Sequence, residues 1–462
     1  MLNDEVRWQS TDRWIMDAPA GKALWNLSVP LIPGLLAFLM VDLVDSYLVL
    51  RRSPLAASVL SLTIPAVNIL FALGLGLSIA VVARLNVARV RASEGYLQNA
   101  VSSNVLWVGV SALSIALISF WLNSYNLLTG LSLFSFDLGS AQTSAASGYL
   151  DRRIIAYPFW LLVFVQVAVF RVLGKAVLAG KIFVTWSVGK IVGSFGVVLF
   201  WGSEVGSEPE ILQVMAAAHL LVDVVFCILC FKKMSSLIGP FTFQFSQSGA
   251  FSSLLRIALP ASIHGLLNSL MLACITVLVS SLGYQALAVY GFVQRVEVFI
   301  LFVPMLLTMS FPVFAGQNWA LGDFEKVKEK YKQCCFIVLA CQSIIYSILF
   351  LLMYRVSGGE QYVYFDDIRS YLILVPASYG FLGIAFLSVS MLNSIGFSKK
   401  ALWVSFARIF MFYIPSIFAG LEVAQMCGFF IGMFVANILS GIFAYCYTIY
   451  LFGKSADKLS LM

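Results

Sequence analysis

Long apolar runs separated by short polar segments repeat along the whole chain. A helix needs about 20 predominantly apolar residues to cross a bilayer. The runs reach this length and do not alternate with period two, so they predict transmembrane helices rather than the strands of a β-barrel. We expect twelve spans, near residues 24–50, 57–83, 98–122, 153–173, 180–202, 210–232, 256–282, 286–314, 334–355, 369–393, 401–420 and 426–452.

Composition supports an all-α polytopic membrane protein. Of the 462 residues, 61% are hydrophobic and 11% are charged, whereas about 25% of the residues in an average soluble protein are charged. No soluble fold buries so much apolar surface. The net charge of +7 reflects basic loops, so it does not indicate a nucleic-acid partner. The acidic N-terminus, with Asp4 and Glu5, does not resemble a cleavable signal peptide.

Lysine and arginine are unevenly distributed between the two sets of alternate loops. Basic residues gather on the side of both termini, as in Lys326, Lys328, Lys330 and Lys332 before the ninth span. The opposite loops contain Arg51, Arg52, Arg152, Arg153, Arg355 and Arg369. The positive-inside rule therefore predicts a multi-pass protein of the inner (cytoplasmic) membrane with both termini in the cytoplasm.

The two halves of the chain resemble each other. Pro30 opens the first span and Pro260 opens the seventh, and a polar segment rich in Ser and Gly separates the halves. We therefore predict a cytoplasmic N-terminus (1–23), an N-lobe (24–232), an inter-lobe linker (233–255), a C-lobe (256–452) and a cytoplasmic tail (453–462). Two parallel six-helix lobes are a transporter architecture, with a cleft that can open to either side.

Ionisable residues inside the spans are the candidates for function, because a charge at membrane depth is costly. Asp42 and Asp45 are three residues apart in the first span and share nearly one helix face. Two close carboxylates raise each other's proton affinity and can exchange a proton near neutral pH. Lys190 would be their counter-charge if its helix faces the first span, and a structural ion pair is the alternative. Asp45 could instead pair with Arg51 or Arg52 near the outer surface.

Five further residues are weaker candidates. Asp223 in the sixth span could act as a counter-charge or relay. The chain has two histidines, His219 and His264. His264 lies four residues before Asn268, so the two side chains share a helix face. His264 and Asn268 either line the cleft or form hydrogen bonds between helices. Arg295 and Glu297 point to different faces of the eighth span. Arg295 could neutralise an anionic group in the cleft or anchor the outer edge of the span.

The sequence contains no GxxxxGK[ST] phosphate loop, no HExxH motif and no metal-spaced His/Cys set. The eight cysteines lie in or at the ends of apolar runs, where ordinary packing is expected. These observations disfavour an enzyme and predict neither a cofactor nor a metal site. Active transport would then draw its energy from an ion gradient.

The end of the eighth span carries a recognisable motif. Gly316, Gln317 and Asn318 are followed by Gly322, Asp323 and a charged loop. This pattern resembles the multidrug and toxin extrusion (MATE) family of transporters. The first span supports the resemblance, since Pro30 and the sequence Val44-Asp45-Ser46 are similar to the first helix of that family.

The MATE resemblance covers essentially the whole chain. It implies two six-helix bundles that form a V-shaped cleft, and an exporter of amphipathic, often cationic compounds in exchange for protons or sodium ions. Asp45 matches the first-helix aspartate that couples ions, and the prolines near it fit a first helix whose bending is linked to protonation. Pro33 belongs to the same pattern.

The chain also departs from the family pattern. Asn268 stands where the NorM-like branch carries a carboxylate, and residues 371–395 contain no acid. The chain resembles the DinF-like branch more than the NorM-like branch. Gly196 stands near the position at which the DinF-like branch carries its second aspartate. We hypothesise that Asp42 supplies the missing carboxylate. The scarcity of oxygen ligands favours H+ over Na+ as the coupling ion.

The leading hypothesis is therefore a monomeric antiporter that exports amphipathic, cationic drugs or metabolites by alternating access. The alternative is a flippase for a lipid-linked saccharide or another anionic lipid, in which Lys190, Arg295 and Arg408 would converge on a pyrophosphate. A third hypothesis is a receptor or scaffold that retains the fold without transport.

Overall fold

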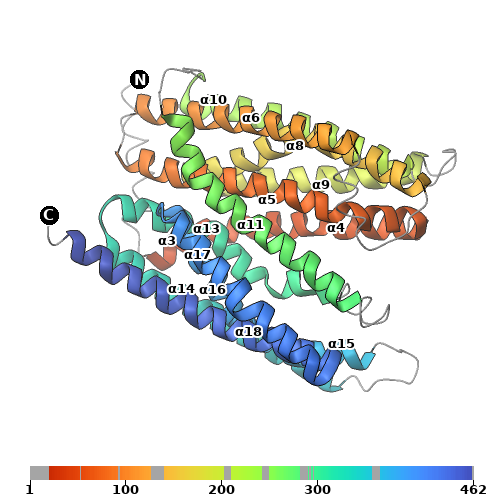
Figure 1. Cartoon of the computed structure of the whole chain (residues 1–462). Helices are drawn as coiled ribbons and strands as arrows, with labels where there is room; N and C mark the ends of the chain where they lie inside the picture. Colours follow the sequence, from red (N-terminus) through yellow and green to blue (C-terminus); the bar gives the residue numbers. More distant parts are fainter. Residues whose placement is uncertain are drawn as a thin grey trace. The chain divides into compact units, whose positions relative to one another are not determined.

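The structure, a computed structural model, describes residues 20–52, 54–91, 94–125, 140–201, 210–241, 249–280, 290, 293–294, 296–355 and 365–459. The elements in these ranges are all helices (Figure 1). Within the described ranges, ten helical segments are long and apolar enough to cross a membrane, and one of them, Ser398–Gly453, has 56 residues. The predicted all-α polytopic membrane fold is confirmed.

The helices follow the predicted spans in order. The first half contains α3 (Ala20–Ser28), the 3-10 turn η1 (Val29–Leu31), α4 (Ile32–Arg52), α5 (Pro54–Arg91), α6 (Glu94–Ser124), α8 (Ser140–Val172), α9 (Ala176–Trp201) and α10 (Glu210–Ile238). The second half contains α11 (Ala250–Ser280), α13 (Phe302–Ala320), α14 (Phe324–Arg355), α15 (Phe365–Leu374), the 3-10 turn η2 (Val375–Ser378), α16 (Tyr379–Ser394), α17 (Ser398–Phe406), the π-helical η3 (Ala407–Tyr413) and α18 (Ile414–Leu459).

The first span is interrupted where its prolines predict a bend. The helix α3 ends at Ser28, the turn η1 follows, and α4 begins at Ile32. Pro30 lies in the turn and has no N–H to donate. Pro33 lies in the first turn of α4, where its missing N–H costs little.

The fourth span begins much earlier than predicted. Helix α8 starts at Ser140, so Arg152 and Arg153 lie inside a helix and their assignment to an outer loop is wrong. Small residues let neighbouring helices approach closely. Ala145 and Ala146 accordingly belong to a buried apolar cluster, although the Ser/Ala/Gly-rich run around them looks like a loop.

Contacts divide the chain into two compact units. One unit holds residues 21–269 and the other holds residues 270–462 together with Ala20. The division falls inside α11, whose first part packs on α5: a Cβ atom added at Gly265 would lie 2.8 Å from the Ala72 Cβ. The lobe boundary at 233–255 stays a prediction. It was inferred from the repeat between the two halves of the sequence, whereas the two units are defined by contacts between residues.

One central helix organises each unit. In the first unit, α8 packs against α5, α6, α9 and α10. The second half of α8 is accordingly apolar on most sides, with Val163, Val165, Val167, Ala168, Val169 and Phe170 all buried. In the second unit, α16 packs against α13, α14 and α18.

The closest approach between α9 and the η1 turn gives a test of this packing. A Cβ atom added at Gly180 would overlap the carbonyl oxygen of Pro30, whereas no heavy atom lies within 4 Å of a Cβ added at Gly196 on the same helix. We predict that Gly180→Ala destabilises the protein by about 1–3 kcal/mol, because the overlapping atom belongs to the backbone. Gly196→Ala should be neutral or stabilising. Thermal unfolding in detergent compares the two variants, and equal melting temperatures would contradict the close approach.

Candidate functional site

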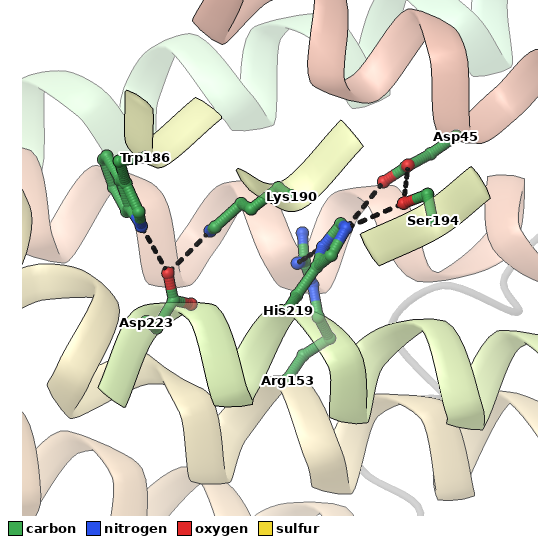
Figure 2. A network of polar contacts seen from close by, with 7 residues as sticks. All are labelled: Asp45, Arg153, Trp186, Lys190, Ser194, His219 and Asp223. Atoms are coloured by element: carbon green, nitrogen blue, oxygen red, sulfur yellow. Dashed lines mark hydrogen bonds and ion pairs between the residues drawn. The ribbon is translucent and has the colours of Figure 1, made fainter. Parts of the chain in front are cut away.

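Four helices of the first unit bring polar side chains into one buried network (Figure 2). The network consists of Asp45 from α4, Arg153 from α8, Trp186, Lys190 and Ser194 from α9, and His219 and Asp223 from α10. The three α9 residues follow one another at intervals of four, as do the two α10 residues. Residues four apart share a helix face, so each helix presents a polar stripe within an apolar surface.

Asp45 is held by a serine and a histidine. The Ser194 hydroxyl donates a hydrogen bond of 2.6 Å to Asp45 Oδ1 and lies 2.9 Å from His219 Nε2. That nitrogen is also 3.6 Å from Asp45 Oδ2. A hydroxyl donates one bond and can accept others. Ser194 can therefore donate to Asp45 while it accepts from His219, which links the two titratable groups.

Arg153 sets the tautomer of this histidine. Its Nη1 lies 3.4 Å from His219 Nδ1. A guanidinium only donates hydrogen bonds, so Nδ1 must be the acceptor. The proton of the neutral imidazole then resides on Nε2, which faces Ser194 and Asp45. The arginine thus directs the donor side of His219 toward the carboxylate.

Lys190 forms a separate buried ion pair at the other end of the network. Its Nζ lies 2.9 Å from Asp223 Oδ1, and the two side chains are 7% and 2% exposed. The Trp186 indole donates a hydrogen bond of 2.7 Å to the same carboxylate oxygen. The Lys190 Nζ also lies 4.6 Å from the centre of the Trp186 ring. Asp223 and Trp186 therefore surround the Lys190 charge, and the ion pair joins α9 to α10.

Asp42 and Asp45 have different environments although they are close in sequence. The Asp42 residue is exposed, whereas the Asp45 side chain is only 16% exposed. Three residues on a helix leave a rotation of about 60° between side chains, which is enough to turn one of them away from α9. The titratable group that Asp45 meets directly is His219, which the sequence analysis did not place at the site.

The remaining candidates lie on other elements. His264 Nε2 and Asn268 Nδ2 are 3.4 Å apart on α11. Glu297 hydrogen-bonds to Tyr379 of α16, whose hydroxyl hydrogen-bonds to Tyr371 of α15. Arg295 lies outside the described residues.

The Gly316-Gln317-Asn318 motif closes a helix. All three residues are buried at the end of α13. The Gln317 carbonyl accepts from the Leu321 N–H, and the Asn318 carbonyl accepts from the Asp323 N–H. Gly322 has a φ of +85°, a left-handed conformation that favours glycine after a helix. The motif therefore builds the turn between α13 and α14.

Comparisons with known proteins agree with this architecture. Residues 260–419 match the family model of MatE. This segment of the chain is therefore similar to the MATE family. Its members are transporters and not enzymes.

Three transporters are similar to nearly the whole chain. A FAD transporter of Shewanella oneidensis is 23% identical over 93% of this chain and 95% of its own length. The MATE transporter VcmN of Vibrio cholerae superposes with a TM-score of 0.86, at 23% identity over 94% of this chain and 97% of its own. A transporter of the MOP superfamily from Pyrococcus furiosus superposes with a TM-score of 0.84. It is 17% identical over 96% of this chain and 98% of its own length.

The MATE fold brings together some of the residues chosen from the sequence and separates others. Asp45, Lys190 and Asp223 lie in one network, whereas Glu297 belongs to the second unit. The choice from the sequence missed Arg153, Ser194, His219 and Trp186. The spacing of four residues on α9 and α10 could have revealed three of these, but Arg153 was assigned to a loop.

The Lys190–Asp223 pair gives a second test. We predict that Lys190→Met costs about 3–5 kcal/mol, because it leaves a buried carboxylate without its counter-charge. Adding Asp223→Asn should recover most of this loss, since the amide oxygen still accepts from Trp186. The control is Lys328→Met in the exposed pair with Glu325, whose atoms are 3.0 Å apart; it should cost about 0–1 kcal/mol. Thermal unfolding in detergent measures all three variants against the wild type, and equal losses of stability for the two single lysine variants would refute the role of burial.

Proposed function

We propose that this protein is a MATE transporter, a secondary active exporter that exchanges an amphipathic small molecule for protons. The contact of Asp45 with Ser194 and His219 carries this proposal. A carboxylate in the interior of a membrane protein usually serves a function. In this network it meets a hydroxyl and an imidazole, and both groups can pass a proton on.

The surroundings of Asp45 favour a proton over a sodium ion. A sodium site needs several oxygen ligands, whereas Asp45 meets one hydroxyl and one ring nitrogen. The described residues contain no cluster of three or more His, Cys, Asp or Glu side chains that could hold a metal ion. The cationic side chain of Arg153 lies behind His219 and repels a further cation. Protons are therefore the proposed coupling ion.

Protonation offers a way to change the shape of the first span. Neutralising Asp45 removes its attraction for the donors on α9 and α10, so the contact of α4 with these helices weakens. The α4 helix begins directly after the η1 turn, where Pro30 has already removed a hydrogen bond. A bend at this point costs less than elsewhere along the span. We propose that proton binding changes this bend during alternating access.

Two chemical classes are candidates for the substrate. The family resemblance favours cationic, amphipathic drugs or metabolites. The relative from Shewanella oneidensis is a FAD transporter, which makes an anionic flavin dinucleotide the second candidate. The flippase hypothesis has less support, because Asp223 takes up the charge of Lys190 that would have to face a pyrophosphate.

We also propose the membrane, the orientation and the oligomeric state in which the protein works. The basic residues on the side of both termini support cytoplasmic termini and a location in an inner membrane. Each unit has its own central helix, which supports transport by a monomer.

Flux in proteoliposomes tests the coupling. We predict that Asp45→Asn reduces transport driven by a pH step at least tenfold, because the amide cannot bind the coupling proton. Two probes, ethidium and FAD, identify the substrate class, and a sodium step in place of the pH step identifies the ion. The control is Glu325→Gln, an exposed carboxylate on α14, which should transport at the wild-type rate. Wild-type flux in Asp45→Asn would refute the coupling role.

A variant of the histidine separates proton transfer from packing. We expect His219→Gln to keep a hydrogen bond to Ser194 but to lose the titratable imidazole. Its flux should therefore depend on pH differently from that of the wild type, while substrate binding at a fixed pH is retained. An unchanged pH profile would show that His219 only packs against Asp45.

A further inference from the structure

A cavity of about 560 Å³ lies in the first unit, away from the polar network. One wall comes from α3 and η1, with Trp25, Val29 and Pro30, and the other from the start of α9 and the turn before it, with Gly174, Lys175 and Lys181. Lys181 and Ser194 are thirteen positions apart on α9, which is about 20 Å along a helix. The cavity is therefore distinct from the site around Asp45.

The backbone fixes the shape of this cavity. The α8 helix ends at Val172, and Gly174 in the turn that follows has a φ of +77°. The next N–H, that of Lys175, donates to the Phe170 carbonyl at 2.9 Å, as in a helix C-cap. On the other side, Gly180 admits the η1 backbone because it has no Cβ. The walls are thus set before any ligand binds.

The charge of the cavity suits an anion. Lys175 and Lys181 both line it, and none of the described lining residues is acidic. Residues 176–178 also line it. They form the first turn of α9, where backbone N–H groups face outward at the positive end of the helix. Two lysines and this helix end together favour a negatively charged group such as a phosphate.

The cavity also has an apolar, accessible side. Trp25 is 68% exposed and Val177 is 58% exposed. Both lie near the ends of candidate spans, Leu24–Val49 and Ala176–Leu199. Tryptophan is enriched where a span meets the membrane surface. A ligand for this place must therefore carry both a negative group and an apolar chain.

We propose that this cavity binds an anionic phospholipid. The headgroup phosphate lies between Lys175 and Lys181, and an acyl chain runs along Trp25 and Val177. The surrounding bilayer supplies this ligand continuously, and basic pockets between transmembrane helices bind such headgroups. A lipid in this position contacts η1, the break in the span that carries Asp45. Lipid binding itself does not depend on the proposed proton coupling.

Fluorescence quenching tests the lipid site. The protein is placed in bilayers in which either phosphatidylglycerol or phosphatidylcholine carries brominated acyl chains, and the signal of Trp25 is taken as the difference from Trp25→Phe. We expect brominated phosphatidylglycerol to quench Trp25 at least twofold more than brominated phosphatidylcholine. The double variant Lys175→Gln/Lys181→Gln should lose this preference. The control Lys232→Gln/Lys233→Gln, which removes two exposed lysines from α10, should keep it.

Three results would overturn the proposal. Equal quenching by the two lipids would show that the cavity does not select an anion. Loss of the preference when inorganic phosphate is added would assign the cavity to a soluble anion. A preference that emerges only after deletion of residues 2–17 would assign the cavity to this acidic N-terminal segment. The melting temperature of each variant confirms that the fold is intact.

Discussion

The free-energy cost of placing a charge inside a membrane-spanning bundle determines how the helices of the first unit pack. A buried ion is tolerated only where a partner and further hydrogen bonds replace the water that it loses. Asp223 meets this requirement through Lys190 and Trp186, and Asp45 meets it through Ser194 and His219. Each partner comes from a different helix from the acid that it satisfies. The same contacts therefore set the rotation of α4, α9 and α10 and hold the groups that would exchange a proton.

The break in the first span is the second element on which this arrangement depends. Pro30 interrupts the helix at η1, and Gly180 lets α9 approach the backbone of that turn closely. The turn therefore lies between two sites, with Asp45 further along α4 and the cavity of Trp25 and Lys181 beside it. A proton at the first site and a lipid at the second would act on the same turn.

The second unit distributes its ionisable groups differently. The sequence lacks acids in the seventh span and in residues 371–395, so the second half looks devoid of coupling residues. In the structure, however, Glu297 of the eighth span contacts Tyr379, which belongs to a buried cluster that also contains Tyr371 and Tyr413. Arg408 is also buried, 5.4 Å from the Phe386 ring, and lies in the π-helical η3. Such π-helical turns often occur at functional sites.

The sequence alone was sufficient to determine the all-α membrane fold, the bend at Pro30, the MATE resemblance and the choice of Asp45, because apolar length, proline chemistry and short motifs are local properties. Only the tertiary structure decided which side chains contact Asp45 and His219. Ser194 lies 149 residues from Asp45, and Arg153 lies 66 residues from His219. A helix that is apolar on every side gives no periodicity from which its rotation can be predicted. The contacts that complete the site are therefore set by how α4, α8, α9 and α10 pack together.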